Sequence, residues 1–150
     1  MTLTDDINAG PLSAINRLLT ATNKHDLPAL VDCFAPGYVN ETPAHPLRGF
    51  TGREQVRSNW EQLFAGVPDL SIKMLSHSVS GHRVWIEASM DGTRRDGTSH
   101  SMAGVLIFEV DGGVIASARF YLEPVERQSG DINDSIDRVT HRVTHGRAAP

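Results

Sequence analysis

The side chains that can bind or activate a small molecule are few in this sequence, and two of them stand two positions apart. Tyr38 and Asn40 have the same parity in an expected short strand over residues 38–41, so they point to the same face. A phenol hydroxyl and an amide can together orient a substrate oxygen or a water molecule. We therefore expect the pair to form the polar part of a binding pocket. A mutual hydrogen bond that satisfies both groups is the structural alternative.

Two ionisable residues are candidates for moving a proton. His100 stands near the start of an expected central strand, and an imidazole titrates near neutral pH. Glu41 can act as a base where burial raises its pKa. Each has a structural alternative: His100 bonded to a neighbour at a strand end, and Glu41 turned away from the pocket because it alternates with Asn40. His45, in a proline-rich loop, is either a residue of the pocket mouth or simply exposed.

The elements that position these residues follow from the spacing of apolar side chains. Apolar residues three and four apart predict helices over residues 11–24, 26–35 and 51–67. The expected strands span residues 38–41, 70–79, 83–91, 100–110 and 114–123. The third helix is expected to begin at a capping box, Thr51-Gly52-Arg53-Glu54. Helices that precede an antiparallel meander predict an α+β fold.

Length and composition exclude several classes of protein. The chain has 150 residues, a net charge of −4 and no basic run, which argues against nucleic-acid binding. Its apolar runs are too short to cross a membrane, and the acidic, polar residues 1–8 do not have the pattern of a signal peptide. The single cysteine, Cys33, excludes a disulfide framework, and no metal-binding motif is present. These features predict a cytoplasmic protein without metal or cofactor.

The composition changes near residue 125, which suggests two parts. Residues 1–125 are expected to form one domain and residues 126–150 a C-terminal extension. Within the extension, Ile132, Ile136, Val139 and Val143 recur at about helical spacing, which favours an amphipathic helix over residues 131–144. The end of the chain, from His145 onward, is expected to be disordered.

A family resemblance rests on short motifs spread over residues 12–123. They are Asp26-Leu27-x-Ala29-Leu30, Phe34-Ala35-Pro36, Tyr38-x-Asn40, Gly52-Arg53-Glu54, Trp60, Pro68-Asp69 and Asp111-Gly112-Gly113-Val114-Ile115. In these motifs and in its order of elements the chain resembles the NTF2-like superfamily, in its SnoaL-like branch. The resemblance implies N-terminal helices packed on a curved, mixed or antiparallel sheet, so that a cone encloses an apolar pocket. It also implies dimerisation through the outer face of the sheet.

Within that superfamily, Tyr38-Val39-Asn40 is similar to the Tyr-x-Asn of limonene-epoxide hydrolases, which hold a water with Tyr, Asn and Asp beside an Arg-x-Asp pair. When the turns at Gly97 and Gly113 are matched, the Arg-x-Asp positions fall on Ala88 and Met90, and the water-holding Asp falls on Phe120. The catalytic ionisable groups of that reaction are therefore not matched, and epoxide hydrolysis is not expected.

The resemblance and the period of two in strands assign residues to the two faces of the sheet. The inward set lines the expected pocket together with Tyr38 and Asn40: Ala88, Met90, Met102, Leu106 and Phe120. Trp60, on the apolar stripe of the third helix, is either part of the core or a pocket wall. The outward set is expected to form a homodimer surface: Trp85, Val105, Ile107, Arg119 and Tyr121.

Such a pocket suits a hydrophobic small molecule. Two functions fit it. The first is a cofactor-free isomerase, cyclase or hydrolase, in which Tyr38 and Asn40 orient the substrate and His100 or Glu41 moves a proton. The second is a non-catalytic protein that binds a ligand, or a partner as a dimer, with the same pocket.

Overall fold

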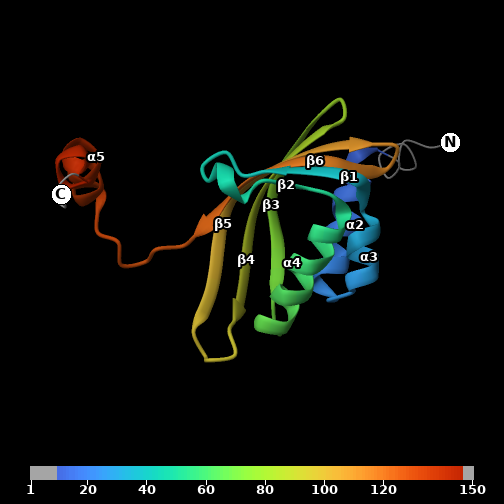
Figure 1. Ribbon diagram of the computed structural model, residues 1–150, viewed down its shortest axis with the longest axis horizontal. Coiled ribbons are helices and arrows are strands. Elements are labelled where there is room, and N and C mark those ends of the chain that lie inside the picture. Colours follow the sequence, from blue (N-terminus) through green and yellow to red (C-terminus); the bar gives the residue numbers. More distant parts are fainter. Residues whose placement is uncertain (1–9, 147–150) are drawn as a thin grey trace.

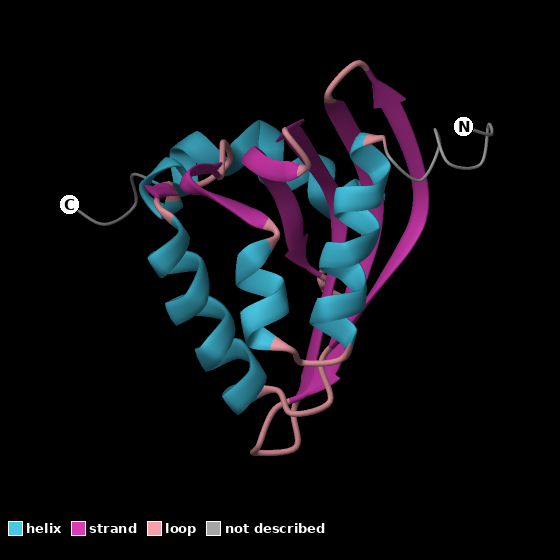
Figure 2. Cartoon of the chain, turned by 90° about the vertical axis from the view of Figure 1, so that its right-hand side faces the viewer, coloured by secondary structure: helices cyan, strands magenta, loops and turns pink. Residues whose placement is uncertain are grey.

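The structure is a computed structural model, and it describes residues 10–146. Three helices, α2, α3 and α4, cover one face of a curved six-stranded sheet (Figures 1 and 2). The helices are α2 (Pro11–Asn23), α3 (Leu27–Asp32), the short 3-10 turn η1 (Pro46–Arg48), α4 (Arg53–Gly66) and α5 (Ile132–Gly146). The strands are β1 (Phe34–Glu41), β2 (Phe50–Thr51), β3 (Ser71–Ser80), β4 (Arg83–Thr93), β5 (Ser99–Asp111) and β6 (Val114–Pro124). The expected α+β class is confirmed.

The sheet has the order β2-β1-β6-β5-β4-β3, and it is mixed because β1 runs parallel to β6 while every other pair is antiparallel. The regular register of β4 with β5, from Arg83↔Glu109 to Thr93↔Ser99, keeps side chains of equal parity on one face. The residues that face the helices are accordingly buried, among them Val84, Ile86, Ala88, Met90, Leu106 and Phe108. Their neighbours Trp85 and Tyr121 face outward and are 43% and 37% exposed.

Strand β1 is longer than the expected strand over residues 38–41, because it begins at Phe34. Phe34 pairs with Ile115, and the pairing then shifts register before Val39 pairs with Ser117. Pro36, inside the shift, has no N–H to donate, so a regular ladder is interrupted there. The second helix ends at Asp32, earlier than its apolar spacing suggested.

Helix α4 does not begin with the expected capping box. Thr51 belongs to β2, where it pairs with Val39, and no side chain caps the helix. The N-cap residue is instead Gly52, with a φ of 103°, a conformation that favours glycine. The requirement to pair β2 with β1 therefore determines how the chain enters α4.

Side chains from the end of α2 hold the helices to the sheet. The Asn23 amide accepts a hydrogen bond from the Ile72 N–H (2.7 Å) and donates one to the Ile72 carbonyl (3.0 Å). These two bonds replace a neighbouring strand at the edge strand β3. His25 contacts the Leu70 carbonyl through Nε2 (2.7 Å) and stacks on Phe64 of α4, with ring centroids 4.3 Å apart. One short turn thus fixes α2, α4 and β3 relative to one another.

Helix α5 stands apart from the sheet, at the end of an extended segment that follows β6 (Figure 1). Ile132, Ile136 and Val139 are exposed along it. The domain boundary at residue 125 stays a prediction. Residues 1–8 and the last four residues of the expected disordered tail lie outside the described part of the chain. In the described part, no helix has both the length and the apolar character needed to cross a membrane.

Candidate functional site

A cavity of about 230 Å³ lies between the helix-covered face of the sheet, α4 and the segment that carries η1 and β2. Most of its wall is apolar: Phe34, Phe50, Val56, Trp60, Leu63, Met90, Met102 and Phe120. Its polar members are Tyr38, Asn40, Thr42, Arg48, Asn59 and His100. A deeper hollow of about 70 Å³ shares Tyr38, Asn40 and Phe120 with the cavity and reaches Leu106 and α2. This composition suits a largely hydrophobic ligand with one or two polar groups.

Strand β1 presents a chain of hydrogen bonds to the cavity. The Tyr38 hydroxyl donates to Asn40 Oδ1 (2.8 Å), and Asn40 Nδ2 donates to Thr42 Oγ1 (3.5 Å). Burial raises the pKa of Tyr38 above its ordinary value, so the hydroxyl stays protonated. Tyr38 is therefore a hydrogen-bond donor and not a base, and the second N–H of Asn40 remains available to a ligand.

His100 lies at the cavity wall near the start of β5, where it pairs with Gly92 of β4. Its Nε2 atom is buried and has no hydrogen-bond partner among the described residues. Desolvation by burial, together with the charge of Arg94, lowers the pKa of His100, and Asp91 only partly opposes them. The imidazole is therefore neutral at pH 7, and Nε2 can accept a proton in one tautomer or donate one in the other.

Two of the candidate site residues, Glu41 and His45, line neither hollow. Glu41 alternates with Asn40 on β1, points away from the cavity and lies 3.8 Å from the guanidinium of Arg119. His45 Nε2 lies 2.9 Å from a carboxylate oxygen of Glu123, which fixes the loop before η1 to the end of β6. Neither residue is placed to move a proton in the cavity.

The inward residues of the sheet divide between the wall and the core. Met90, Met102 and Phe120 line the cavity, and Leu106 lines the deeper hollow. Ala88 is completely buried on the same face but lines neither. Trp60 contributes to both the wall and the core, because it lines the two hollows and packs at 5.7 Å from Phe64, measured between ring centroids.

Three polar wall residues were missed by the sequence prediction. Thr42 has the same parity as Tyr38 and Asn40, and this signal identifies it in retrospect. Asn59 precedes Leu63 by four residues on α4, so the two share a helix face. Arg48 lies in η1, and no periodic pattern in the sequence indicates where it points. Among the described residues, no group of three or more His, Cys, Asp or Glu is placed to hold a metal ion.

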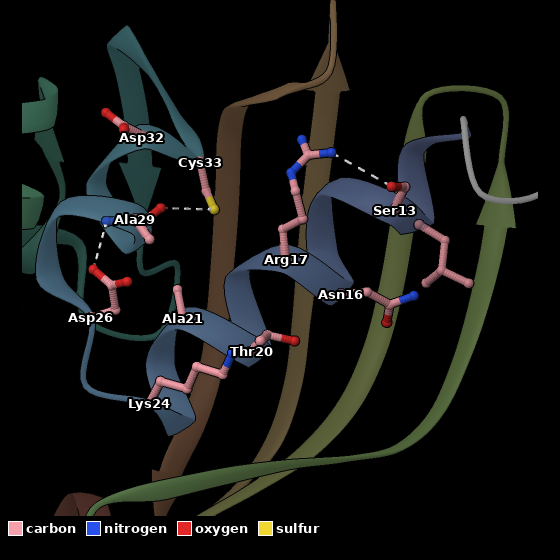
Figure 3. Close-up of a pocket in the computed structure, with 11 residues that line it drawn as sticks. Ser13, Asn16, Arg17, Thr20, Ala21, Lys24, Asp26, Ala29, Asp32 and Cys33 are labelled. Atoms are coloured by element: carbon pink, nitrogen blue, oxygen red, sulfur yellow. Dashed lines mark hydrogen bonds between the residues drawn. The ribbon is translucent and has the colours of Figure 1, made fainter.

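An open groove of about 620 Å³ lies elsewhere, between α2 and α3 (Figure 3). Its lining carries both signs of charge: Arg17, Lys24, Asp26 and Asp32. The Cys33 thiol donates to the Ala29 carbonyl at 3.3 Å, and burial raises the pKa of Cys33, which disfavours the nucleophilic thiolate form. Within the groove Arg17 donates to Ser13, and the Ala29 N–H donates to Asp26 (Figure 3). We take the apolar cavity as the candidate functional site because its wall holds the buried, unpartnered Nε2 of His100.

The lowered pKa of His100 predicts how stability depends on pH. The unfolded chain takes up a proton near pH 6.5, the ordinary pKa, whereas the folded protein takes it up only at lower pH. Protonation therefore favours the unfolded state. His100 has no such effect well above pH 6.5, and it increasingly destabilises the folded protein as the pH falls through that value. We expect the free energy of unfolding to fall less between pH 7.5 and pH 5 in His100→Gln than in the wild type. An equal fall in both proteins would contradict the prediction, and His82→Gln, which changes an exposed histidine, is the control.

Comparisons with solved structures identify the same architecture in several proteins. An LEH-like epoxide hydrolase from Mycobacterium tuberculosis aligns with a TM-score of 0.67 and 16% identity, over 90% of this chain and 96% of that one. A second M. tuberculosis protein, solved with estradiol-17beta-hemisuccinate, aligns with a TM-score of 0.66 and 20% identity, over 75% of this chain and 93% of that one. A putative polyketide cyclase from Streptomyces antibioticus aligns with a TM-score of 0.65 and 23% identity, over 75% of this chain and 91% of that one. These likenesses establish the fold alone.

Sequence comparison gives the family. No curated protein matches this chain in sequence. The family model for the SnoaL-like domain matches residues 15–118, which run from α2 to the middle of β6 and include every residue that lines the cavity except Phe120. The chain therefore belongs to the SnoaL-like family, within the NTF2-like fold.

Proposed function

We propose that this protein binds a hydrophobic small molecule in the cavity and catalyses its isomerisation or cyclisation by proton transfer, without a cofactor. The observation that carries the proposal is the buried, unpartnered Nε2 of His100 at the wall of an apolar cavity. A buried polar atom without a partner costs free energy, and functional sites are where such a cost is tolerated. A polar ligand group that forms a hydrogen bond with Nε2 would remove that cost.

The groups of the cavity suit an enolisation. Neutral His100 takes a proton from a carbon next to a substrate carbonyl, and the electron pair of the C–H bond moves to the carbonyl oxygen. The enolate oxygen accepts hydrogen bonds from the free Asn40 N–H and, once it leaves Asn40, from the Tyr38 hydroxyl. In an isomerisation, His100 returns the proton to another carbon. In a cyclisation, the enolate carbon attacks a second carbonyl, and the resulting alkoxide takes the proton.

Three similar structures support a ligand of this class. One is solved with estradiol-17beta-hemisuccinate, a second is a putative polyketide cyclase and a third is an LEH-like epoxide hydrolase. The identities are low, so this support concerns the use of the fold for small, largely hydrophobic molecules and not the identity of the substrate.

The test measures enolisation directly. 2-Tetralone, a bicyclic ketone, exchanges its α-protons for deuterium in D₂O, and proton NMR follows the rate. We expect the wild type to accelerate exchange, and His100→Gln to remove at least about 10²-fold of that acceleration, which is the usual contribution of a general base. His82→Gln is expected to behave as the wild type. Saturable binding without faster exchange would overturn the catalytic proposal.

A non-catalytic binding protein is the second candidate. The hydrogen bond between Tyr38 and Asn40 favours it, because the two groups already satisfy each other, and no carboxylate lines either hollow in the described residues. This function predicts that 2-tetralone binds equally well to the wild type and to His100→Gln, and that neither protein accelerates exchange.

We also propose that the protein forms a homodimer through the outer face of the sheet, which carries Trp85, Val105, Ile107, Arg119 and Tyr121. Aromatic residues and arginine are enriched in such interfaces, and exposed apolar sheet favours association. We expect Trp85→Glu to convert a dimer into a monomer of 16.4 kDa in sedimentation equilibrium at micromolar concentration. The matched control is Leu47→Glu, an equally polar change at a fully exposed residue of η1. A wild type that sediments as a monomer would refute the proposal.

A further inference from the structure

A third hollow, separate from the deeper hollow described above, adjoins the cavity at His100. It has a volume of about 540 Å³ and lies between the second half of α4 and the β4–β5 loop. Asn59, Leu63 and His100 line both this hollow and the cavity, so the two spaces are neighbours that share the side of His100. We name this hollow of about 540 Å³ the vestibule. A ligand that extends beyond the apolar cavity past His100 must enter it.

The vestibule differs from the cavity in polarity. Arg94 is its one formal positive charge, Asn59 and Gln62 add amides, and no carboxylate is among the described residues that line it. Arg94 is held in place, because its Nη1 donates to Thr98 Oγ1 (3.3 Å) and to the Ser99 carbonyl. Its Nη2 and Nε make no hydrogen bond with the described residues and remain free to donate. A positioned guanidinium with free N–H groups is suited to bind a carboxylate.

The amide of Asn59 adds donors on the side of α4. Its Oδ1 accepts a hydrogen bond from Gln55 Nε2 at 2.8 Å, one turn earlier on the helix. This bond orients the amide, and the N–H groups of Nδ2 make no hydrogen bond with the described residues, so they can donate to a ligand. Donors from α4 and from the β4–β5 loop therefore border the same hollow, and no acid is among its described lining residues. The carboxylate in the same loop as Arg94 is that of Asp96, which bonds to Thr98 and whose pKa the charge of Arg94 helps to lower.

We propose that the ligand is a hydrophobic carboxylic acid, whose apolar body fills the cavity and whose carboxylate binds Arg94 in the vestibule, with Asn59 as a second donor. This rests on the proposed function, since the same cavity holds the ligand, and it adds the substrate class and the residue that selects it. Arg48 also lines the cavity. It is the less suitable arginine, because no hydrogen bond to a described residue fixes its side chain and ordering it would cost more entropy.

The site also couples the acid to the proton-transfer group. The charge of Arg94 lowers the pKa of His100, and Asp91 acts in the opposite direction. A carboxylate bound to Arg94 neutralises much of that charge and brings a negative charge near the imidazole, so both changes raise the pKa of His100. A neutral ligand of the same shape does neither.

The test compares 4-(1-naphthyl)butanoic acid with 4-(1-naphthyl)butan-1-ol, which share a flat body and a tail of equal length. Calorimetry at pH 7.5 and low salt gives the two dissociation constants. We expect the wild type to bind the acid more tightly, and Arg94→Gln to weaken the acid about fivefold, the upper range for a partly exposed ion pair, with the alcohol unchanged. Arg57→Gln removes an equal charge from the outer surface of α4 and is expected to change neither constant. NMR titration of His100 is expected to show a higher pKa with the acid than with the alcohol.

Three results would overturn the proposal: equal affinity of the wild type for acid and alcohol, equal loss of both in Arg94→Gln, or a preference for the acid that disappears in Arg48→Gln and not in Arg94→Gln. If neither probe binds, the cavity is not the ligand site, and the proposed function fails with the vestibule. If the alcohol binds and the acid has no advantage, only the substrate class fails. Acid preference without faster exchange of 2-tetralone would leave this inference standing and remove the catalytic function.

Discussion

Hydrolysis of a cyclic terpene epoxide by this protein is expected to stay close to the rate in buffer, although an LEH-like epoxide hydrolase shares its fold. In the resemblance to limonene-epoxide hydrolases, the positions where that chemistry needs Arg, Asp and Asp fall on Ala88, Met90 and Phe120. Met90 and Phe120 line the cavity, and Ala88 is buried on the same face of the sheet. Because none of these three side chains carries an ionisable group, none can act as an acid or activate a water as a base. A general base contributes about 10²–10⁴-fold, and the acid that would protonate the epoxide oxygen is missing as well.

Chromatographic measurement of limonene-1,2-epoxide turnover tests this expectation, with His100→Gln beside the wild type. His100 is the one group of the cavity that could replace the missing base, since its Nε2 is buried at the wall. Robust turnover by the wild type would refute the prediction. If the variant then lost the activity, His100 would be identified as a replacement base, whereas unchanged activity would point to a group outside the cavity.

Replacement of Gly104 by alanine is expected to lower the free energy of unfolding by about 3 kcal/mol or more. Gly104 lies in the middle of β5 with a φ of 152°, and β6 approaches it closely. A Cβ atom there would lie 2.2 Å from the Tyr121 carbonyl oxygen and 3.1 Å from Leu122 Cα. Both are backbone atoms of a paired strand, so they cannot move aside without loss of the β5–β6 register.

Urea unfolding monitored by circular dichroism measures this effect. Gly66→Ala is the control, because an added Cβ at the end of α4 meets no atom within 4 Å. That variant is expected to be neutral or to gain up to about 1 kcal/mol, since alanine reduces the entropy of the unfolded chain. A Gly104→Ala protein as stable as the wild type would show that the close approach of the two strands is not required.

The walls of the cavity could be predicted from the sequence to the extent that local rules determine them. The period of two in β4, β5 and β6 depends only on backbone geometry. Once the family resemblance places Phe120 on the inward face, alternation along the strands assigns Met90 and Met102 to the same face. The same rule predicts Tyr38 and Asn40 as a pair on one face of the strand, and the Tyr38 hydroxyl does donate a hydrogen bond to Asn40 Oδ1.

The features that were not predicted depend on contacts between distant parts of the chain. The start of β1 at Phe34 is set by its pairing with β6, and the ion pair of His45 depends on where β6 ends. Thr51 matches a capping box in sequence, but pairing with Val39 uses it in β2. Arg48 and Arg94 lie in segments without periodicity, so only the folded chain brings them to the hollows.

The parallel pairing of β1 with β6 also determines when the binding site can form. Phe34 must meet Ile115, and all of α4 and β3–β5 lies between them in the chain. Loop closure of that length carries an entropic cost that local helices and hairpins do not, so this pairing is expected among the last contacts made during folding. Tyr38 and Asn40 reach the cavity only with that step. A ligand should therefore slow unfolding and leave the folding rate almost unchanged, because the structure it recognises does not exist before the rate-limiting barrier is crossed.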